Sequence, residues 1–387
     1  MLRRLVVIPV AMLFGSIIAG LHYYMAQRMV VAAQWPEPVE SLLLGLVMLL
    51  AALLFVAPIG ERFLPPDRAK WLVWPSALWM GTGWLVLVGL LVTDAGIGLL
   101  GFVGSPELIS GAARVRAVAL VALVLPTVVS AVSSALGRPV VNQVRVGLDR
   151  WPEGLRPLRL VQITDIHIGV LLGRDFAQWL TDEVNRLQPD VIAVTGDLVD
   201  GTVEHLRDRV APFAGLEAPM GVYFVTGNHD HYSGGRDWVT EIERLGLTPL
   251  RNRHVELEID GHTVVLAGVD DHRGGFLPGD GGEDLDAALE GIHDAHPVIL
   301  LAHDPTTFKE ASKRDVDLQV SGHTHGGQIW PFHYLVRLAQ PWVAGLHREG
   351  HSAIWVSRGT GSWGPPMRLG APAEITNLSI GARLSPS

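Results

Sequence analysis

Hydrophobic positions divide this chain into two parts with different patterns. Four long apolar segments fill the first part: Leu5 to Ala26, Ser41 to Ile59, Trp71 to Val92 and Val115 to Leu136. Each is close to the roughly 20 residues that a helix needs to cross the hydrocarbon core of a bilayer. Tryptophans such as Trp35 and Trp71 flank the segments, as at membrane interfaces. The pattern predicts an all-α transmembrane region of four helices within residues 1–137.

The first apolar segment allows a second interpretation. Arg3 and Arg4 precede it, as in a cleaved signal peptide or a twin-arginine export signal. No clean small-x-small cleavage site follows the segment, and three further apolar segments come after it. A membrane helix is therefore the favoured interpretation.

Short apolar runs replace the long ones after residues 138–156, a polar stretch with Pro139 and Pro152 that we expect to be a linker. Such runs, continuous rather than alternating in polarity, are typical of buried strands. Five of them stand out: Leu158 to Ile163, Val191 to Val194, Val222 to Val225, Val298 to Leu301 and Leu318 to Val320. We expect residues 157–387 to form one domain.

Helical stretches such as Arg174 to Leu187 and Glu283 to His293 alternate with these runs, which is the rhythm of an α/β fold. Two further strand pairs are expected. Arg253 to Ile259 and Thr263 to Val269 form a β-hairpin, and Ala353 to Ser357 with Glu374 to Ile380 complete the sheets.

Residues with metal-ligand side chains follow each of the five short runs. The blocks are Asp165-Ile-His167, Gly196-Asp197, Gly227-Asn228-His229-Asp230, His303 and Gly322-His323-Thr-His325. Alternate residues of an extended chain point to the same side, so the first and last residues of a D-x-H or H-x-H block can reach one ion. The functional crevice of an open α/β sheet lies beyond the carboxyl ends of its strands. Any one of these residues alone is more simply a turn, cap or packing residue, but the ordered set predicts a two-metal hydrolase.

The blocks resemble, in their order, the calcineurin-like metallophosphoesterases, whose hallmarks are D-x-H, G-D, G-N-H-[DE], a lone H and G-H-x-H. The resemblance covers about residues 156 to 381, and segments such as TDIHIG, VTGDLVDG and SGHTHGGQIWPF are similar to the bacterial membrane-associated branch. It implies a four-layer αββα metallophosphoesterase sandwich. One departure is Asp230-His231, where relatives often have Glu-Tyr.

The resemblance also implies roles for the residues. Two divalent metal ions, Mn, Fe or Zn, suit a mixture of carboxylate and imidazole ligands. It implies that a metal-bound hydroxide attacks phosphorus, while His229 clamps a phosphate oxygen or protonates the leaving oxygen and Asp230 orients His229. The implied ligands of the first metal are Asp165, His167, Asp197 and His325, and those of the second are Asp197, Asn228, His303 and His323.

Charge narrows the class of substrate. The chain is 48% hydrophobic with a mean hydropathy of +0.29, and the apolar excess lies in the first part. Residues 1–137 hold 8 Lys+Arg and 6 Asp+Glu, which leaves 22 and 33 for the remainder and makes it acidic by 11 charges. An acidic domain argues against long nucleic acid as a partner, so small or lipid-linked phosphoesters remain. The absence of cysteine excludes disulfides, thiolate zinc sites and cysteine nucleophiles.

Basic residues near the ends of the apolar segments predict the topology. Eight of them fall on one side and three (Arg28, Arg114 and Arg116) on the other, which favours a cytoplasmic catalytic domain on a multi-pass protein of the cell membrane. Besides Arg116 at the start of the fourth segment, we expect essentially only His22 and Asp94 as charged or imidazole side chains of the spans, both near segment ends. An anchor is therefore favoured over a transport path.

Three other segments are candidates for the site. Asp270-Asp271-His272-Arg273 follows an apolar run and could reach the same rim. Arg358 and Arg368 flank a Gly/Pro-rich stretch and form either a phosphate-binding fork or a structural surface pair. The apolar segment Ile329 to Leu346 either lies on a bilayer and admits a lipid head group, or packs under the sheet.

The favoured function is that of a membrane-anchored dimetal phosphohydrolase acting on a lipid or cell-envelope phosphodiester. Preference for monoester or diester stays open, as does the oligomeric state. The alternative is a non-catalytic, metal-stabilised binding module or a membrane sensor. His229 beside the full ligand set favours the enzyme, because a binding module needs neither an open metal site nor that histidine.

Overall fold

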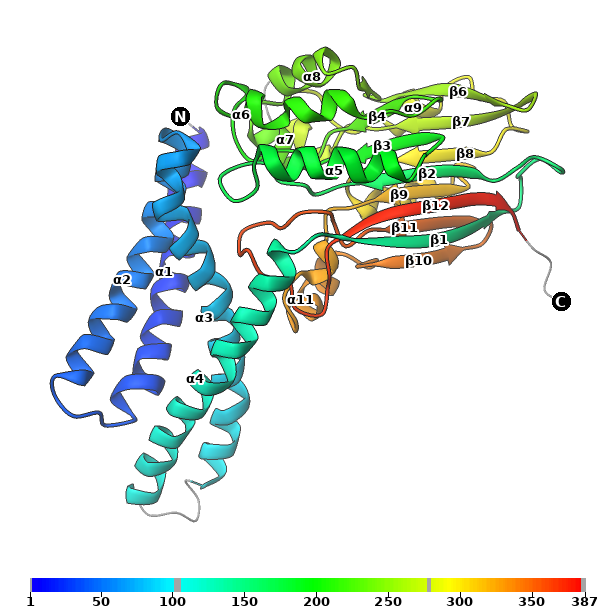
Figure 1. Ribbon diagram of the computed structural model, residues 1–387. Coiled ribbons are helices and arrows are strands. Elements are labelled where there is room, and N and C mark those ends of the chain that lie inside the picture. The colour runs from blue at the N-terminus through cyan, green and yellow to red at the C-terminus, as the bar shows by residue number, and fades with distance from the viewer. Residues whose placement is uncertain (1, 101–105, 277–279, 384–387) are drawn as a thin grey trace. The chain divides into compact units, whose positions relative to one another are not determined.

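The computed structural model describes residues 2–100, 106–276 and 280–383 of the chain, which divides into two compact units (Figure 1). The first unit comprises residues 1–132 with 364–366, and the second comprises residues 133–363 with 367–387.

Long helices make up the first unit. They are α1 (Leu2–Ala26), continued by a short π-helix η1 (Gln27–Val31), α2 (Val39–Phe63), α3 (Pro66–Leu100) and α4 (Pro106–Leu136). Three are long and apolar enough to cross a membrane, namely α2 over Val39–Glu61, α3 over Pro66–Leu99 and α4 over Gly111–Leu136. The first predicted segment forms α1, but the side chains of residues 5–11 lie outside those described. The structure thus bears on three of the four predicted spans.

A polar cluster lies within this unit around Asp94 of α3. Tyr24 donates its hydroxyl to Asp94 Oδ2 at 2.6 Å, Arg28 Nε lies 2.9 Å from the same oxygen, and Arg116 pairs with Oδ1. Because a charge in apolar surroundings is costly unless it is paired, these contacts account for a carboxylate among apolar helices.

The second unit contains two six-stranded mixed sheets. In Figure 1 the last strand, drawn in red, lies between β1 and β2 of the first sheet. The order in the first sheet is β1 (Val140–Leu148), β12 (Glu374–Ala382), β2 (Leu158–Ile163), β3 (Val191–Thr195), β4 (Val222–Val225), β5 (Thr248–Pro249). The order in the second is β10 (Gly345–Glu349), β11 (Ser352–Val356), β9 (Leu318–Ser321), β8 (Val298–Leu301), β7 (His262–Gly268), β6 (Arg253–Ile259).

Alternate residues of the central strands fill two different cores. Leu158 and Leu160 of β2 face the second sheet, where they join Leu266 and Val320. Val161 and Ile163 of the same strand belong to the core beneath the helices of the outer face. Both faces of the strand are therefore buried, which explains why its sequence is continuously apolar.

Helices cover the outer faces of both sheets, so the layers follow the order helix, sheet, sheet, helix. The first sheet is covered by α5 (Arg174–Arg186), α6 (Val203–Val210) and α8 (Gly235–Arg244). The second is covered by α9 (Leu285–Leu289) and α10 (Phe308–Ala311). Shorter elements are η2 (Ala211–Gly215), α7 (Asn228–Tyr232), η3 (His272–Phe276), η4 (Pro305–Thr307), η5 (His325–Gly327) and α11 (His333–Ala339).

Two segments differ from the prediction. The stretch 138–156, expected to be a linker, contains β1, which pairs in parallel with β12 along its whole length. Val146 and Leu148 of β1 enter the core between the sheets while Arg145 and Gly147 do not, a period-two pattern that its polar residues obscure. The helix expected over Glu283 to His293 is only the short α9, and Gly291 with a φ of 80° follows its end.

Candidate metal centre

The predicted ligand residues lie where buried strands end. β2, β3 and β4 are parallel neighbours in the first sheet, and β8 and β9 are parallel neighbours in the second. Because parallel strands end at the same edge, the loops that follow them meet there. Five of the seven predicted ligands turn out of their strands with a positive φ, which is uncommon outside glycine: Asp165 (52°), His167 (54°), Asp197 (52°), His323 (72°) and His325 (50°).

Glycines allow these strand exits to approach one another closely. A Cβ atom at Gly227 would lie 2.2 Å from Asp197 Oδ1, and one at Gly322 would lie 2.2 Å from Asp165 Oδ2. Both distances are far shorter than van der Waals contact, so a side chain at either position would displace a carboxylate. Glycine is therefore required at position 227 by Asp197 and at position 322 by Asp165, residues that belong to different sequence blocks.

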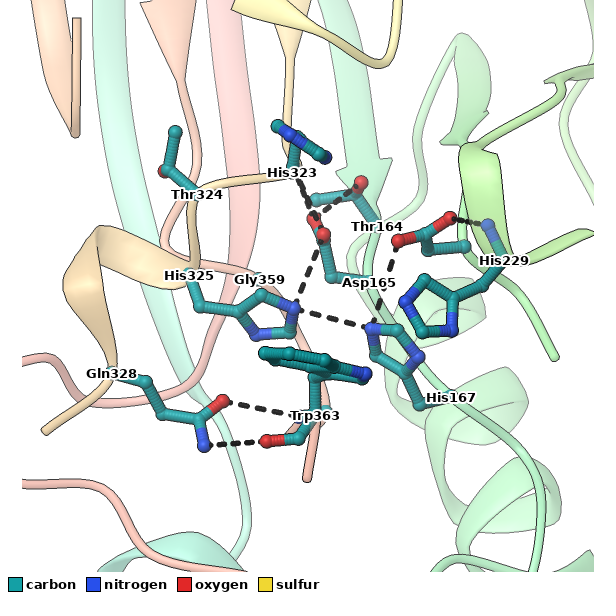
Figure 2. A network of polar contacts seen from close by, with 12 residues as sticks. Thr164, Asp165, His167, His229, His323, Thr324, His325, Gln328, Gly359 and Trp363 are labelled. Carbon is teal, nitrogen blue, oxygen red and sulfur yellow. Dashed lines mark hydrogen bonds and ion pairs between the residues drawn. The ribbon is translucent and has the colours of Figure 1, made fainter. Parts of the chain in front are cut away.

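Asp165, His167 and His325 form one group of potential metal ligands, and Figure 2 shows their side chains pointing toward one another. His325 Nε2 lies 3.1 Å from His167 Nε2 and 3.4 Å from Asp165 Oδ1. Asp165 also accepts hydrogen bonds from Thr164 Oγ1 at 2.8 Å and from the backbone N–H of His323 at 2.9 Å. These bonds hold the carboxylate against the imidazoles.

Asp197, His303 and His323 form a second group. His303 Nε2 lies 3.2 Å from Asp197 Oδ2 and 3.3 Å from His323 Nδ1. The other nitrogen of His303 lies 2.8 Å from the Thr195 carbonyl, a geometry that places its proton on Nδ1 and leaves Nε2 as the ligand atom. Asp197 Oδ2 also lies 3.8 Å from His167 Nε2, so this carboxylate reaches toward both groups.

Asn228 completes the predicted set at the start of α7. Its side chain is buried, and Oδ1 has no hydrogen-bond partner in the part of the chain that the structure describes. A buried amide oxygen without a partner is costly. An orphaned acceptor fits a metal ligand, and the next residue in the chain, His229, donates its backbone N–H to Asp197 Oδ1 at 2.8 Å.

The protonation of two of the imidazoles also fits metal binding. For His303, burial would lower the pKa, but the charge of Asp197 holds it well above its usual value while no cation is bound. Burial lowers the pKa of His323, and the neighbouring His303 lowers it further. Burial and the nearby His167 hold the pKa of His325 well below its usual value. Burial alone would raise the pKa of Asp197, but its attraction to His303 outweighs burial and keeps it well below the usual range. Two neutral imidazoles and an ionised carboxylate are the forms that coordinate a divalent cation.

His229 lies beside the first group, and its ring is hydrogen-bonded to Asp200, a residue that was not predicted for the site. Asp200 Oδ1 lies 2.6 Å from His229 Nδ1, and its Oδ2 lies 3.1 Å from His167 Nδ1. Burial would lower the pKa of His229, but the bond to Asp200 and the charge of Asp197 raise it to about 9. The only signal for Asp200 in the sequence is a carboxylate three residues beyond the Gly-Asp block.

Asp230, which we expected to orient His229, contacts the backbone instead. Its oxygens accept hydrogen bonds from the N–H groups of Asp197 (2.9 Å), Leu198 (2.9 Å) and Gly227 (2.8 Å). Burial and the charge of Asp197 raise the pKa of Asp230 to about 6, although these N–H groups favour its ionised form. Asp230 therefore ties two strand exits together.

The two candidate arginines have structural contacts. Arg368 is buried and donates to several backbone carbonyls, among them those of Arg358 at 2.6 Å and His325 at 3.2 Å. Arg358 pairs with Glu374 at 2.9 Å. These contacts support a structural role for both residues, but Arg368 is buried, so the expectation of a surface pair was wrong.

Aromatic and apolar side chains flank His229 and follow His325 in the chain. The ring of His229 packs edge-on against Tyr232 and Trp363, with centroids 5.6 Å and 5.7 Å away. Trp363 is held by two hydrogen bonds between its backbone and the side chain of Gln328 (Figure 2).

The segment from Ile329 to Leu346 follows Gln328, and none of the residues of its helix α11 is buried. The exposed large side chains of this segment are Trp330, Phe332, Tyr334, Leu335 and Leu338.

Known proteins resemble this chain. A family model described as calcineurin-like phosphoesterase matches residues 158–327. A "Transmembrane protein with metallophosphoesterase domain" from Bos taurus is 40% identical over 274 residues, which are 67% of this chain and 62% of that protein. The chain thus spans less than two thirds of this relative's length. An "Uncharacterized metallophosphoesterase" from Aquifex aeolicus is 32% identical over 62% of this chain and 91% of its own length. A solved 5'-nucleotidase precursor from Thermus thermophilus superposes with a TM-score of 0.37 at 14% identity, over 58% of this chain and 55% of that one.

Proposed function

This chain belongs to the calcineurin-like phosphoesterase family, and on that premise we propose that it is a membrane-anchored phosphohydrolase that uses two divalent metal ions, Mn, Fe or Zn. The observation that supports the proposal is that potential ligands from the exits of β2, β3, β8 and β9 gather in two groups. His229, which we do not count as a ligand, lies beside the first group. In this proposal Asp165, His167, Asp197 and His325 hold one ion, and Asp197, Asn228, His303 and His323 hold the other.

The protein side chains have separate tasks in this proposal. Two cations bound together would stabilise both the attacking and the leaving oxygen of an in-line displacement at phosphorus. His229 supplies a proton to the leaving oxygen from Nε2, because its Nδ1 faces Asp200. Its pKa of about 9 keeps that proton in place at neutral pH. Asp230 acts on the backbone and positions the exits that carry Asp197 and Asn228.

Hydrolysis of an aryl phosphodiester with added Mn²⁺ tests the proposal. The wild-type protein in detergent is expected to be active, and Asp197→Ala and His229→Ala are each expected to lose activity. Only Asp197→Ala is expected to lose bound metal as well, because His229 is not a ligand. A protein that binds metal but hydrolyses no phosphoester would favour the alternative, a binding or sensor module.

The favoured substrate is a lipid or cell-envelope phosphodiester. Support comes from the exposed apolar segment that begins at Trp330, five residues after His325, and ends in Leu338, which is 84% exposed. Aromatic and aliphatic side chains with a nearby arginine, here Arg337, are typical of segments that lie in a membrane interface. Such a segment would bring a lipid head group to the metals.

A comparison of lipid and soluble substrates tests this preference. Leu338→Ser is expected to slow hydrolysis of a phosphodiester lipid in vesicles while leaving a soluble aryl phosphodiester unaffected. Val140→Ser, which removes another exposed apolar side chain from β1, is the matched control and should change neither rate. If Leu338→Ser hydrolyses the vesicle lipid as fast as Val140→Ser does, the lipid preference is removed. The phosphohydrolase proposal would stay intact.

The proposed location is the cell membrane, with several spans and a cytoplasmic catalytic unit. Relatives named as transmembrane proteins and three apolar helices support membrane attachment. The excess of basic residues on one side supports the orientation. Since the chain has no cysteine, a single Lys313→Cys can be labelled selectively. A cytoplasmic unit predicts labelling by an impermeant maleimide only after the cells are opened.

A further inference from the structure

A second group of carboxylate and imidazole side chains lies at the exits of β7 and β8. Asp271 and His272 follow β7, and Asp304 follows β8, which pairs with β7 in parallel. One potential ligand atom of each residue lies within 4.8 Å of the others. None of the seven predicted metal ligands belongs to this group. It repeats, one strand further along the sheet, the geometry that gathers His303 and His323 after β8 and β9.

The carboxylate of Asp271 is incompletely satisfied. The residue is only 3% exposed, and its Oδ1 accepts a hydrogen bond from the backbone N–H of Arg273 at 2.8 Å. Its Oδ2 is buried and has no hydrogen-bond partner among the residues that the structure describes. A buried carboxylate oxygen without a donor or a cation is strongly unfavourable. A cation bound at Asp271 Oδ2 would offset this cost.

The preceding residue provides a direct contrast. Asp270 is equally buried, but Arg251 lies 2.8 Å from its Oδ2 and Thr226 donates to its Oδ1 at 3.1 Å. The same loop thus neutralises one carboxylate with an arginine and leaves the next without one. Burial in this loop does not by itself prevent pairing.

Asp304 offers a second free carboxylate oxygen to the same place. Its Oδ1 accepts three hydrogen bonds, two from Thr306 at 2.8 Å and one from Gln340 at 3.1 Å. Its Oδ2 faces His272 Nε2 at 3.9 Å and His323 Nε2 at 3.7 Å, both beyond hydrogen-bond length. This oxygen points toward nitrogens without bonding either of them.

Negative charge accumulates around this group of side chains. Burial raises the pKa of the adjacent Glu283, and the charges of Asp271 and Asp304 contribute to this. Glu283 accepts a hydrogen bond from Thr307 Oγ1 at 2.8 Å. Across the described ranges, the cationic partners within 4.0 Å of these three carboxylates are imidazoles alone.

We infer that Asp271, His272 and Asp304 bind a third divalent cation, separate from the pair proposed above. Two carboxylate oxygens and one imidazole nitrogen suit Mn²⁺ or a similar ion, and water can fill the remaining positions because His272 is partly exposed. Ligands about 2.0–2.6 Å from an ion lie up to roughly 5 Å apart across it, which the observed spacing satisfies. The ion supplies the positive charge that Asp271 lacks, and it joins the β7 and β8 loops through Asp304 Oδ2.

The inference is tested by counting the Mn²⁺ ions bound to the full chain in detergent. The protein is first stripped of metal with a chelator and then dialysed against excess Mn²⁺. The wild-type protein is expected to bind three ions per chain, and Asp271→Asn and His272→Gln are each expected to bind one fewer. His272→Gln alters a partly exposed residue, so it keeps the test valid if Asp271→Asn does not fold. Asp270→Asn is the matched control, because it changes the neighbouring carboxylate, and it should keep all three ions.

The outcome is independent of the proposed pair. In Asp197→Ala, which disables the shared ligand of that pair, Mn²⁺ should still raise the thermal unfolding midpoint, and adding Asp271→Asn should abolish this rise. A wild-type count of two, or an unchanged count in both Asp271→Asn and His272→Gln, overturns the third site. An Asp197→Ala protein with an unchanged count would contradict the metal pair and leave the third site standing.

Discussion

Replacing Asp200 with asparagine tests how far two histidines depend on the carboxylate behind them. Asp200 contacts His229 Nδ1 at 2.6 Å and His167 Nδ1 at 3.1 Å. A hydrogen bond to a charged group contributes about 1.5–3 kcal/mol, and loss of a carboxylate that orients a metal-binding histidine typically costs about 10–100-fold in metal affinity or activity. Asparagine preserves the shape and can still accept one of the two bonds. We therefore expect the hydrolysis rate of Asp200→Asn to fall by about 10–100-fold.

The same substitution should move the pH dependence of the reaction. Burial opposes the charged form of His229, and the bond to Asp200 and the charge of Asp197 overcome it to raise its pKa to about 9. Without the charge of Asp200 this pKa falls, so His229 loses its proton at a lower pH. We expect the alkaline limb of the pH–rate profile to shift toward lower pH.

Both effects can be measured with a soluble aryl phosphodiester at saturating Mn²⁺, from about pH 6 to 10, a range that brackets the ordinary and raised pKa values of histidine. Asp208→Asn, at an exposed position of α6, is the matched control and should behave like the wild type. An Asp200→Asn protein with the wild-type rate and an unmoved alkaline limb would refute the role of Asp200 as the group that orients His229.

Three further predictions concern stability and metal binding. The pKa of Asp190 is lowered because the bonds from Arg159 and Arg156 outweigh burial, so its contribution is present above the unfolded pKa of about 3.9 and is lost as the pH falls through the lower folded value. Urea unfolding should accordingly show a smaller loss of stability in acid for Asp190→Asn than for the wild type, and equal slopes would contradict this. Arg368→Met leaves several carbonyls without their buried donor and should cost about 3 kcal/mol or more, with a lower thermal midpoint as the readout and an unchanged midpoint as the contrary result. A chelator should lower both the hydrolysis rate and the thermal unfolding midpoint, and added Mn²⁺ should restore them. Asn228→Ala should require about tenfold more Mn²⁺ to recover activity. The role of Asn228 as a ligand is contradicted if this variant recovers at the same Mn²⁺ concentration as the wild type.

The strands and the points where they end could be predicted because both faces of each strand are buried. Both faces of strands such as Leu158–Ile163 are buried, so the sequence is continuously apolar until the chain turns. The residue types that follow each strand then mark the edge where the loops meet. β1 was missed because Asn142, Gln143 and Arg145 interrupt its apolar pattern, and its pairing partner β12 lies more than 200 positions away.

The contacts that could not be predicted depend on segments far apart in the chain. Asp200 gives no local signal of its role, because it acts only where His229 folds back against it. The partner of Asp230 is likewise the backbone of another strand exit rather than its neighbour in the sequence. The burial of Arg368 requires carbonyls from the surrounding loops. A single sequence contains the residues but not these pairings.

The left-handed turns at the strand exits have an evolutionary consequence. Each such residue other than glycine costs the folded chain about 1–2 kcal/mol, and five of the predicted ligands adopt this conformation. Glycine at any of these positions would relieve the backbone and remove the ligand together. A screen for thermal durability alone should therefore enrich inactive variants at these sites, whereas a screen for turnover should retain the strained residues.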